Sequence, residues 1–257
     1  MAAGPKPVRI AHAFGNSREA LQLALDADVD MIEVDIWYRG DNIHVHHARR
    51  LSPFPILVDR QMPGHPLPPF AIPVWKGYYA WPHLNPITLD ELLTTVAGQK
   101  RLLLDVKGRY KRGEGDGFAT AIARDVRRRG ASSWSVVCGQ TYPPLNALRR
   151  LAPEIEVRYS LEKPYQWQSF LRKMQKDATV RQVCIAHGFI DNAKARVMEE
   201  HGIDLYVWTV DDPERAIHWV SQGVDGIISN NLELLVNLPR LEAKNVATVH
   251  PSPEGGA

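Results

Sequence analysis

Short apolar runs alternate with amphipathic stretches along almost the whole sequence, and this alternation constrains the fold more than any other feature. Eight runs rich in Val, Ile and Leu are typical of strands, and each precedes a segment with helical periodicity. The runs start at positions 8, 30, 101, 135, 154, 182, 203 and 223. Because they are nearly continuously apolar, they indicate parallel strands buried on both faces. The sequence therefore predicts an α/β fold, a (β/α)8 TIM barrel, with an open doubly wound sheet as the alternative.

A long segment interrupts this pattern after the second predicted strand. Residues 48–87 hold nine of the nineteen prolines of the chain and many aromatic side chains. A disordered linker would not carry so much apolar surface, so we expect a long ordered loop that packs against the barrel and contributes to function. Residues 1–238 would then form one domain. Residues 239–257 lose periodicity and end in Pro, Ser and Gly, which predicts a flexible tail.

Composition and charge exclude several other classes of protein. A length of 257 residues suits a single barrel domain. The 31 Lys+Arg and 29 Asp+Glu nearly cancel, so the chain carries little net charge. The arginines at 127–129 lie in a helical pattern with Asp125, so we expect a solvated face and no nucleic-acid partner. The two cysteines lie in apolar runs, which predicts no disulfide framework. No run approaches the ~20 residues of a membrane span and the N-terminus lacks a signal-peptide core, so we expect a cytoplasmic protein.

Carboxylates near the ends of two predicted strands are the first candidates for a functional site, because the strand ends of a parallel barrel form its active-site face. Glu33 and Asp35 are two positions apart, so their side chains point the same way and would repel each other inside the barrel. Asp105, after a run of leucines, can supply a third carboxylate. A hard divalent cation, Mg²⁺ or Ca²⁺, would relieve the repulsion. The alternative is an ion-pair network with Lys107 and nearby arginines.

Histidines follow the first predicted strand and the extended piece after the second. His12 and His47 could meet at the barrel mouth as an acid–base pair. Alternation along the extended piece places His44 and His46 on one face and His47 on the other, so His47 is the first choice and His46 the second. The alternatives are a structural role for His12 at the barrel rim, surface positions for His44 and His46, and a zinc site without the usual ligand spacing.

Five short motifs together resemble the glycerophosphodiester phosphodiesterase family. They are IAH, IEVDI and LDVK at the first three strands, and VWTVDDPE and GVDGIIS near the end, so the resemblance spans about residues 8–236. It implies a TIM-barrel enzyme that hydrolyses glycerophosphodiesters to glycerol phosphate and an alcohol, with a substrate hydroxyl as the nucleophile. The resemblance assigns metal ligation to Glu33, Asp35 and Asp105, general acid and base catalysis to His12 and His47, and substrate binding to Lys107 and Trp208. The alternatives are an Asp105 salt bridge for Lys107 and a core position for Trp208.

The sequence also departs from the pattern of this family. The common His-Arg-Gly at the first strand is replaced by His12 and Ala13, the common His-Asp after the hairpin by His47 and Ala48, and the third acid is Asp rather than Glu. The short first loop and the Asp-x-Lys of the third strand are similar to the sphingomyelinase D and lysophospholipase D branch, whose substrates carry lipid tails. Two alternative functions therefore stay open: hydrolysis of lipid phosphodiesters, and a non-catalytic barrel that binds a phosphorylated ligand.

Overall fold

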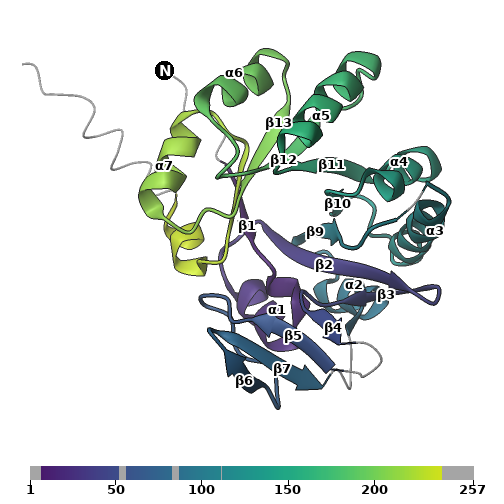
Figure 1. Cartoon of the computed structure of the whole chain (residues 1–257), viewed down its shortest axis with the longest axis vertical. Helices are drawn as coiled ribbons and strands as arrows, with labels where there is room; N and C mark the ends of the chain where they lie inside the picture. The colour runs from purple at the N-terminus through teal and green to yellow at the C-terminus, as the bar shows by residue number, and fades with distance from the viewer. Residues whose placement is uncertain (1–6, 52–55, 83–86, 111, 239–257) are drawn as a thin grey trace, which may run out of the picture.

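The computed structural model of the chain describes residues 7–51, 56–82, 87–110 and 112–238. Its main feature is a closed barrel of eight parallel strands (Figure 1). The strands are β1 (Val8–Ala11), β2 (Met31–Arg39), β9 (Arg101–Val106), β10 (Ser135–Gly139), β11 (Glu156–Leu161), β12 (Gln182–Ala186), β13 (Asp204–Trp208) and β14 (Gly226–Ser229). The barrel closes because β1 pairs with β14 on one side and with β2 on the other. The predicted TIM barrel is thus confirmed, and the open sheet is excluded.

Helices follow the barrel strands and cover the outside of the sheet. They are α1 (Arg18–Asp26), α2 (Leu89–Val96), α3 (Arg112–Arg128), α4 (Tyr142–Leu151), α5 (Pro164–Lys176), α6 (Asn192–Glu200) and α7 (Pro213–Ser221), and residues 232–238 are also helical. Ser17 caps α1 as its sequence position indicates, because its side chain accepts from the Ala20 amide. Helix α3 begins four residues before the expected start, since glycines in its first turns weaken the helical signal. A Cβ on Gly115 would lie 2.8 Å from the Pro144 nitrogen, so glycine permits the close packing of α3 on α4.

Side chains fill the interior of the barrel below its carboxyl end. At the opposite end Arg158 is 1 % exposed, forms ion pairs with Glu156 and Asp204, and lies 3.4 Å above the Tyr206 ring. A buried apolar layer follows, made of Ile10, Met31, Leu103, Val136, Cys138, Cys184, Tyr206 and Ile228. Both cysteines are buried and free, as their apolar surroundings in the sequence indicate. The barrel interior is therefore a packed apolar layer, with a buried ion-pair cluster at one end and the mouth at the other.

A hairpin leads the chain out of the barrel after β2. Strand β3 (Asn42–Val45) pairs antiparallel with β2, and the two-residue turn between them has positive φ at Gly40 and Asp41, 51° and 66°. A two-residue turn with positive φ at both positions matches the right-handed twist of the strands on either side of it. The chain returns through the short strand β8 (Ile87–Thr88), which pairs with β3. The hairpin thus sets where the segment between β3 and β8 meets the barrel mouth.

The segment between β3 and β8 folds into a small antiparallel sheet, where the sequence predicts only an ordered loop. Its strands are β4 (Arg49–Leu51), β5 (Ile56–Arg60), β6 (Ile72–Trp75) and β7 (Tyr78–Pro82), and Figure 1 shows the sheet beside α1. The prolines hide these strands in the sequence. Four of them lie between β5 and β6, Pro73 lies on the edge strand and Pro82 ends β7, positions where a missing N–H is tolerated.

Two further expectations from the sequence can be compared with the structure. Arg127, Arg128 and Arg129 form ion pairs with Glu154 and Asp90 on the protein surface. None of the helices in the described residues is both long and apolar enough to cross a bilayer. The expected C-terminal tail, residues 239–257, lies outside the described residues.

Candidate active site

Strand register brings the three predicted carboxylates together at the barrel mouth. Asp35 on β2 and Asp105 on β9 are direct partners across neighbouring strands, and Glu33 shares a face with Asp35. One oxygen of each carboxylate lies within 4.8 Å of the others. Glu33 is 3 % exposed and Asp35 is fully buried. The carboxylates are therefore close enough to repel one another, as the sequence predicts, and water screens this repulsion little because Glu33 and Asp35 are buried.

Lys107 lies between two of these carboxylates. Its Nζ is 2.6 Å from Asp35 Oδ1 and also hydrogen-bonds to Asp105 Oδ2. Burial alone would lower the pKa of Lys107, but the carboxylates, Asp105 first, outweigh burial and raise it. Burial and the neighbouring Asp35 raise the pKa of Glu33 well above its usual range. When all three carboxylates are ionised, they and the one ammonium leave two negative charges, and these oxygen donors fit a hard divalent cation such as Mg²⁺ or Ca²⁺.

The turn after β1 holds two of the carboxylates in place. The 3₁₀ turn η1 (Phe14–Asn16) brings the Asn16 amide to Asp35, donating to Oδ2 at 2.7 Å and accepting from the Asp35 amide at 2.8 Å. The Ala13 amide donates to Glu33 Oε2 at 2.6 Å. Burial raises the pKa of Asp35, but Lys107 and then His47 outweigh it and lower the pKa below its usual value. A Cβ on Gly15 would lie 1.9 Å from Val34, so only glycine lets the turn approach β2.

A relay of hydrogen bonds orients His12. Its Nδ1 lies 2.8 Å from Asn230 Oδ1, and Asn230 Nδ2 donates to Asp211 Oδ2 at 2.8 Å. Because the Asp211 carboxylate only accepts, the amide oxygen of Asn230 must face His12, which places the proton on Nδ1. The other ring nitrogen, Nε2, then carries a lone pair 3.9 Å from Glu33 Oε2. Burial lowers the pKa of His12, which favours this neutral form.

His47 lies in the opposite electrostatic environment. Its Nδ1 is 2.7 Å from Asp59 Oδ1 on β5, and this bond raises the pKa of His47. The neighbouring His46 is 2 % exposed, stacks on Trp37 and bonds through Nδ1 to the Ala48 carbonyl. These contacts give His46 a packing role. Of the two candidates in the sequence, His47 remains the first choice, because Asp59 of the small sheet is its carboxylate partner.

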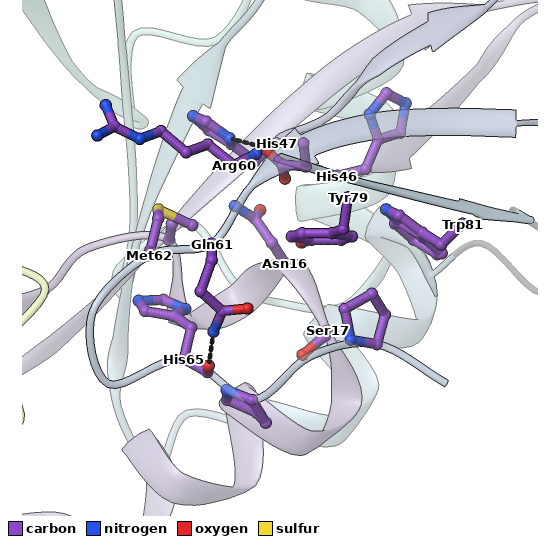
Figure 2. A pocket seen from close by; sticks show the side chains of 14 residues that line it. Asn16, Ser17, His46, His47, Arg60, Gln61, Met62, His65, Tyr79 and Trp81 are labelled. Atoms are coloured by element: carbon purple, nitrogen blue, oxygen red, sulfur yellow. Dashed lines mark hydrogen bonds and ion pairs between the residues drawn. The ribbon is translucent and has the colours of Figure 1, made fainter. Parts of the chain in front are cut away.

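A pocket lies between the small sheet and the barrel mouth (Figure 2). His47, Asn16 and Ala13 form part of its wall, and Tyr79, Trp81 and six residues between positions 60 and 68 form much of the rest. The predicted carboxylates, Lys107 and Trp208 are not part of this wall. His65 also lines the pocket, with its ring centroid 4.0 Å from that of Phe14, and burial lowers its pKa to about 4. A third imidazole, neutral at pH 7, thus lies at the mouth.

Trp208 ends β13, at the upper edge of the apolar layer that fills the barrel. Its ring packs against this layer, and its buried Nε1 has no hydrogen-bond partner among the described residues. The position combines the two expectations from the sequence, because the ring packs against the core while the residue stands at the carboxyl end of its strand. Whether it contacts substrate stays a prediction.

Sequence reasoning missed several polar residues that hold the predicted ones in place: Asn16, Asp59, His65, Asp211 and Asn230. Asp211 lies within the motif VWTVDDPE, and Asn230 directly follows the motif GVDGIIS. These two motifs were therefore the sequence signal that could have pointed to both residues. Asp212, next to Asp211, caps α7. The long inserted segment contributes Asp59 and His65, and nothing in its pattern indicates which of its residues face the barrel.

The fold and the site together define a class of protein: a (β/α)8 barrel with an acidic cluster that could hold a metal ion and two histidines at the carboxyl ends of its strands. Residues 82–234, more than half of the chain, match the model of the glycerophosphoryl diester phosphodiesterase family. The chain belongs to this family. No functionally curated protein matches the sequence.

Solved structures with the same fold include three described as phosphodiesterases. The Oleispira antarctica enzyme, in complex with the product sn-glycerol-3-phosphate, is 19 % identical with a TM-score of 0.66, covering 91 % of this chain and 96 % of its own. The Parabacteroides distasonis glycerophosphodiester phosphodiesterase is 16 % identical with a TM-score of 0.68, covering 94 % and 100 %. The Thermotoga maritima glycerophosphodiester phosphodiesterase is 17 % identical with a TM-score of 0.64, covering 91 % and 99 %. At these identities the likeness concerns the fold.

Proposed function

We propose that the protein is a metal-dependent phosphodiesterase that hydrolyses glycerophosphodiesters to glycerol phosphate and an alcohol. The observation that carries this proposal is the pair of histidines in opposite environments beside the three-carboxylate cluster. Membership of the family supports it, as does the glycerol phosphate bound to the Oleispira antarctica enzyme. A divalent cation held by Glu33, Asp35 and Asp105 would neutralise a non-bridging oxygen of the scissile phosphate.

The partners of the two histidines assign their roles. His12 holds a proton on Nδ1 against Asn230, so its Nε2 can accept the proton of the glycerol hydroxyl next to the phosphate. That oxygen bonds to phosphorus while the bond to the leaving alcohol breaks, giving a cyclic phosphate. His47, whose cationic form Asp59 stabilises, donates its proton to the leaving oxygen. Water then opens the ring with the two histidines in reversed roles.

The remaining polar groups would bind the phosphate and the substrate. The Lys107 ammonium stays charged among the carboxylates and can stabilise charge on the phosphoryl oxygens. His65 stays neutral, and its buried Nε2 has no hydrogen-bond partner among the described residues, so it is a candidate contact for a polar group of the substrate. Trp208 would form the substrate wall on the far side of the barrel mouth. These assignments rest on position at the mouth, on burial and on charge.

Phosphorus NMR with glycerophosphocholine tests the activity directly. We expect a new phosphomonoester resonance in the presence of Mg²⁺ or Ca²⁺, with a cyclic phosphate signal preceding it, and no conversion in EDTA. Conversion that is indifferent to EDTA would contradict the metal dependence. A folded protein that binds glycerol phosphate but converts no diester with either cation would favour the non-catalytic barrel instead.

The substitution Asp59→Asn tests the acid role of His47. In the native protein the Asp59 carboxylate raises the pKa of His47, so the protonated form persists to higher pH than in a free imidazole. Loss of that charge lowers the pKa, and the donor is then lost at lower pH. We expect the alkaline limb of kcat/KM against pH to move to lower pH, with a severalfold loss at pH 8 relative to pH 6, while the acid limb stays in place.

The matched control for this pH profile is Asp116→Asn, at an exposed aspartate on α3 that pairs with Arg150. It should leave both limbs unchanged. If Asp59→Asn instead reduced activity equally at every pH, Asp59 would only position the imidazole, and the assignment of His47 as the acid would lose its support.

A further inference from the structure

Exposed apolar side chains gather on the β6–β7 hairpin of the small sheet and on the chain that leads into it. Of the ten exposed large hydrophobic residues in the described chain, four are scattered over helices and six lie between positions 67 and 78. We call these six the hairpin patch: Leu67, Phe70, Ile72, Val74, Trp75 and Tyr78. Large apolar residues that cluster in the open in this way mark a surface that another molecule covers.

The hairpin presents this patch at one end of the molecule. Strand β6 is the outer strand of the small sheet, and Figure 1 shows β6 and β7 at the lower end of the longest axis. Lys76 and Gly77 form the turn between them, with φ of 47° and 79°, and Trp75 and Tyr78 are strand partners on either side of it. A two-residue turn with positive φ at both positions holds its strands in a tight hairpin. The tip is therefore an ordered projection that can reach a flat surface.

The exposed charges of the hairpin and of the strand beside it are positive. Between positions 56 and 82 the sequence has one acid, Asp59, and its side chain is buried. Arg60 and Lys76 are exposed, and the Lys76 ammonium lies 4.3 Å from the Trp75 ring centroid. Aromatic rings beside a lysine are typical of segments that lie at a bilayer surface, where anionic head groups attract the ammonium. Apolar surface and charge at the tip thus fit the same kind of partner.

We propose that the hairpin patch docks the protein onto an anionic lipid surface, with Trp75 inserted among the lipids and Lys76 beside their head groups. The proposal is independent of the proposed activity, because the patch shares no residue with the acidic cluster or with the two catalytic histidines. It assigns a partner to a part of the inserted segment that takes no part in the chemistry.

The exposure of β6 favours a lipid surface over a protein partner. Alternate residues of a strand point to opposite faces, and all four residues of β6 are exposed, so apolar side chains project on both sides. A folded partner would cover one face and leave the other in water, whereas lipid surrounds both. Pro73 removes an amide from the strand edge, and the β6–β7 register shifts between Pro73 and Trp75. Both features oppose strand pairing with a second copy of the chain.

Vesicle binding in EDTA tests the docking surface without turnover. With vesicles of phosphatidylserine and phosphatidylcholine in equal parts, the native protein should co-sediment, and its tryptophan emission should move to shorter wavelength as Trp75 leaves water. Trp75→Thr should lower the partition coefficient by about tenfold, a factor typical of the burial of one large apolar side chain, and should abolish the emission shift. Threonine suits a strand and the Trp75 side chain is 70 % exposed, so the fold should persist.

Lys76→Asn tests the contribution of charge. Asparagine followed by glycine is a favoured composition for a turn with two positive φ angles, so this substitution removes the charge and keeps the turn. One lysine near an anionic surface contributes about fivefold in affinity. We expect Lys76→Asn to weaken binding to the mixed vesicles by about that factor and to leave the weaker binding to pure phosphatidylcholine unchanged. Equal losses on both vesicles, or native affinity for both that is the same, would refute an anionic partner.

The matched control is Tyr165→Thr, at an aromatic residue on α5 that is 66 % exposed and far from the small sheet in Figure 1. It should bind both vesicles as the native protein does. Absence of vesicle binding, or equal binding by Trp75→Thr, would overturn the proposal. So would a native dimer in analytical ultracentrifugation that Trp75→Thr converts to monomer, because the patch would then be a contact between copies. Trp75→Thr should hydrolyse dissolved glycerophosphocholine at the native rate, so a failure of docking and a failure of the proposed activity are distinguishable.

Discussion

Replacing Asp35 with asparagine is expected to abolish cation binding and to lower kcat/KM by about a thousandfold. A bound cation contributes several kcal/mol to the stabilisation of transition-state charge, and about 4 kcal/mol corresponds to that factor. Asp35 is central to the cluster, because it contacts Lys107, accepts from Asn16 and is the strand partner of Asp105. Asparagine has a similar volume but leaves two carboxylates against one ammonium. The remaining single negative charge no longer matches a divalent cation.

Thermal unfolding with and without Mg²⁺ or Ca²⁺ measures cation binding independently of activity. A cation at one hundred times its dissociation constant should stabilise the native protein by about 2.7 kcal/mol. Asp35→Asn should show no such shift, while its stability without metal stays close to that of the native protein. Asp125→Asn, at another buried aspartate that pairs with Arg124 and Arg128 on α3, serves as the control and should keep both the shift and the activity. An undiminished cation shift in Asp35→Asn would refute the proposed ligand set.

The barrel and its acidic cluster could be predicted because both follow from local periodicity. Continuous apolar runs indicate buried parallel strands, and two acids at a spacing of two must share a face. Register then places Asp105 beside Asp35, a pairing that the positions of the two acids within their strands already indicate. Lys107 follows from the same alternation, two residues beyond Asp105. In each case the relevant contact lies within one strand or between neighbouring strands.

The residues that orient the histidines could not be predicted, because their contacts join distant parts of the chain. His12 and Asn230 are 218 positions apart and meet only because β1 and β14 close the barrel. Asp59 reaches His47 only because the inserted segment forms a sheet that the prolines conceal. His44 and His46 resemble His47 in sequence, and only the tertiary partner of each imidazole separates a packing role from a candidate chemical one.

The inserted sheet also shows why function is harder to predict than fold in this chain. The barrel supplies the acids and His12, whereas His47 depends on Asp59 of β5, and much of the pocket wall comes from β7 and from residues between positions 60 and 68. Family members that lack this segment would build that wall from other residues. Substrate preference would then follow the inserted segment and not the barrel.

His12→Ala is expected to lower kcat by 10² to 10⁴, the usual contribution of a positioned general base. The loss follows from the relay that holds the ring: Asp211 fixes the Asn230 amide, and Asn230 fixes the proton on Nδ1. Removing the ring also leaves Asn230 Oδ1 without its partner, at a cost of about 1–3 kcal/mol in stability. Cation-induced thermal stabilisation should persist, because His12 is not among the proposed ligands. His201→Ala, at an exposed histidine that directly follows α6, should change neither quantity.

A double-substitution cycle distinguishes a base held by this relay from a histidine that only packs. Asn230→Ala should lower kcat by about tenfold, since it frees the ring to rotate and to exchange tautomers. In the His12→Ala background the same substitution should have almost no further effect on kcat, because Asn230 acts on the reaction only through His12. Additive losses would show that Asn230 touches the substrate itself. Full activity of His12→Ala would remove the base from the mechanism and leave the family's barrel in this chain with a different proton acceptor.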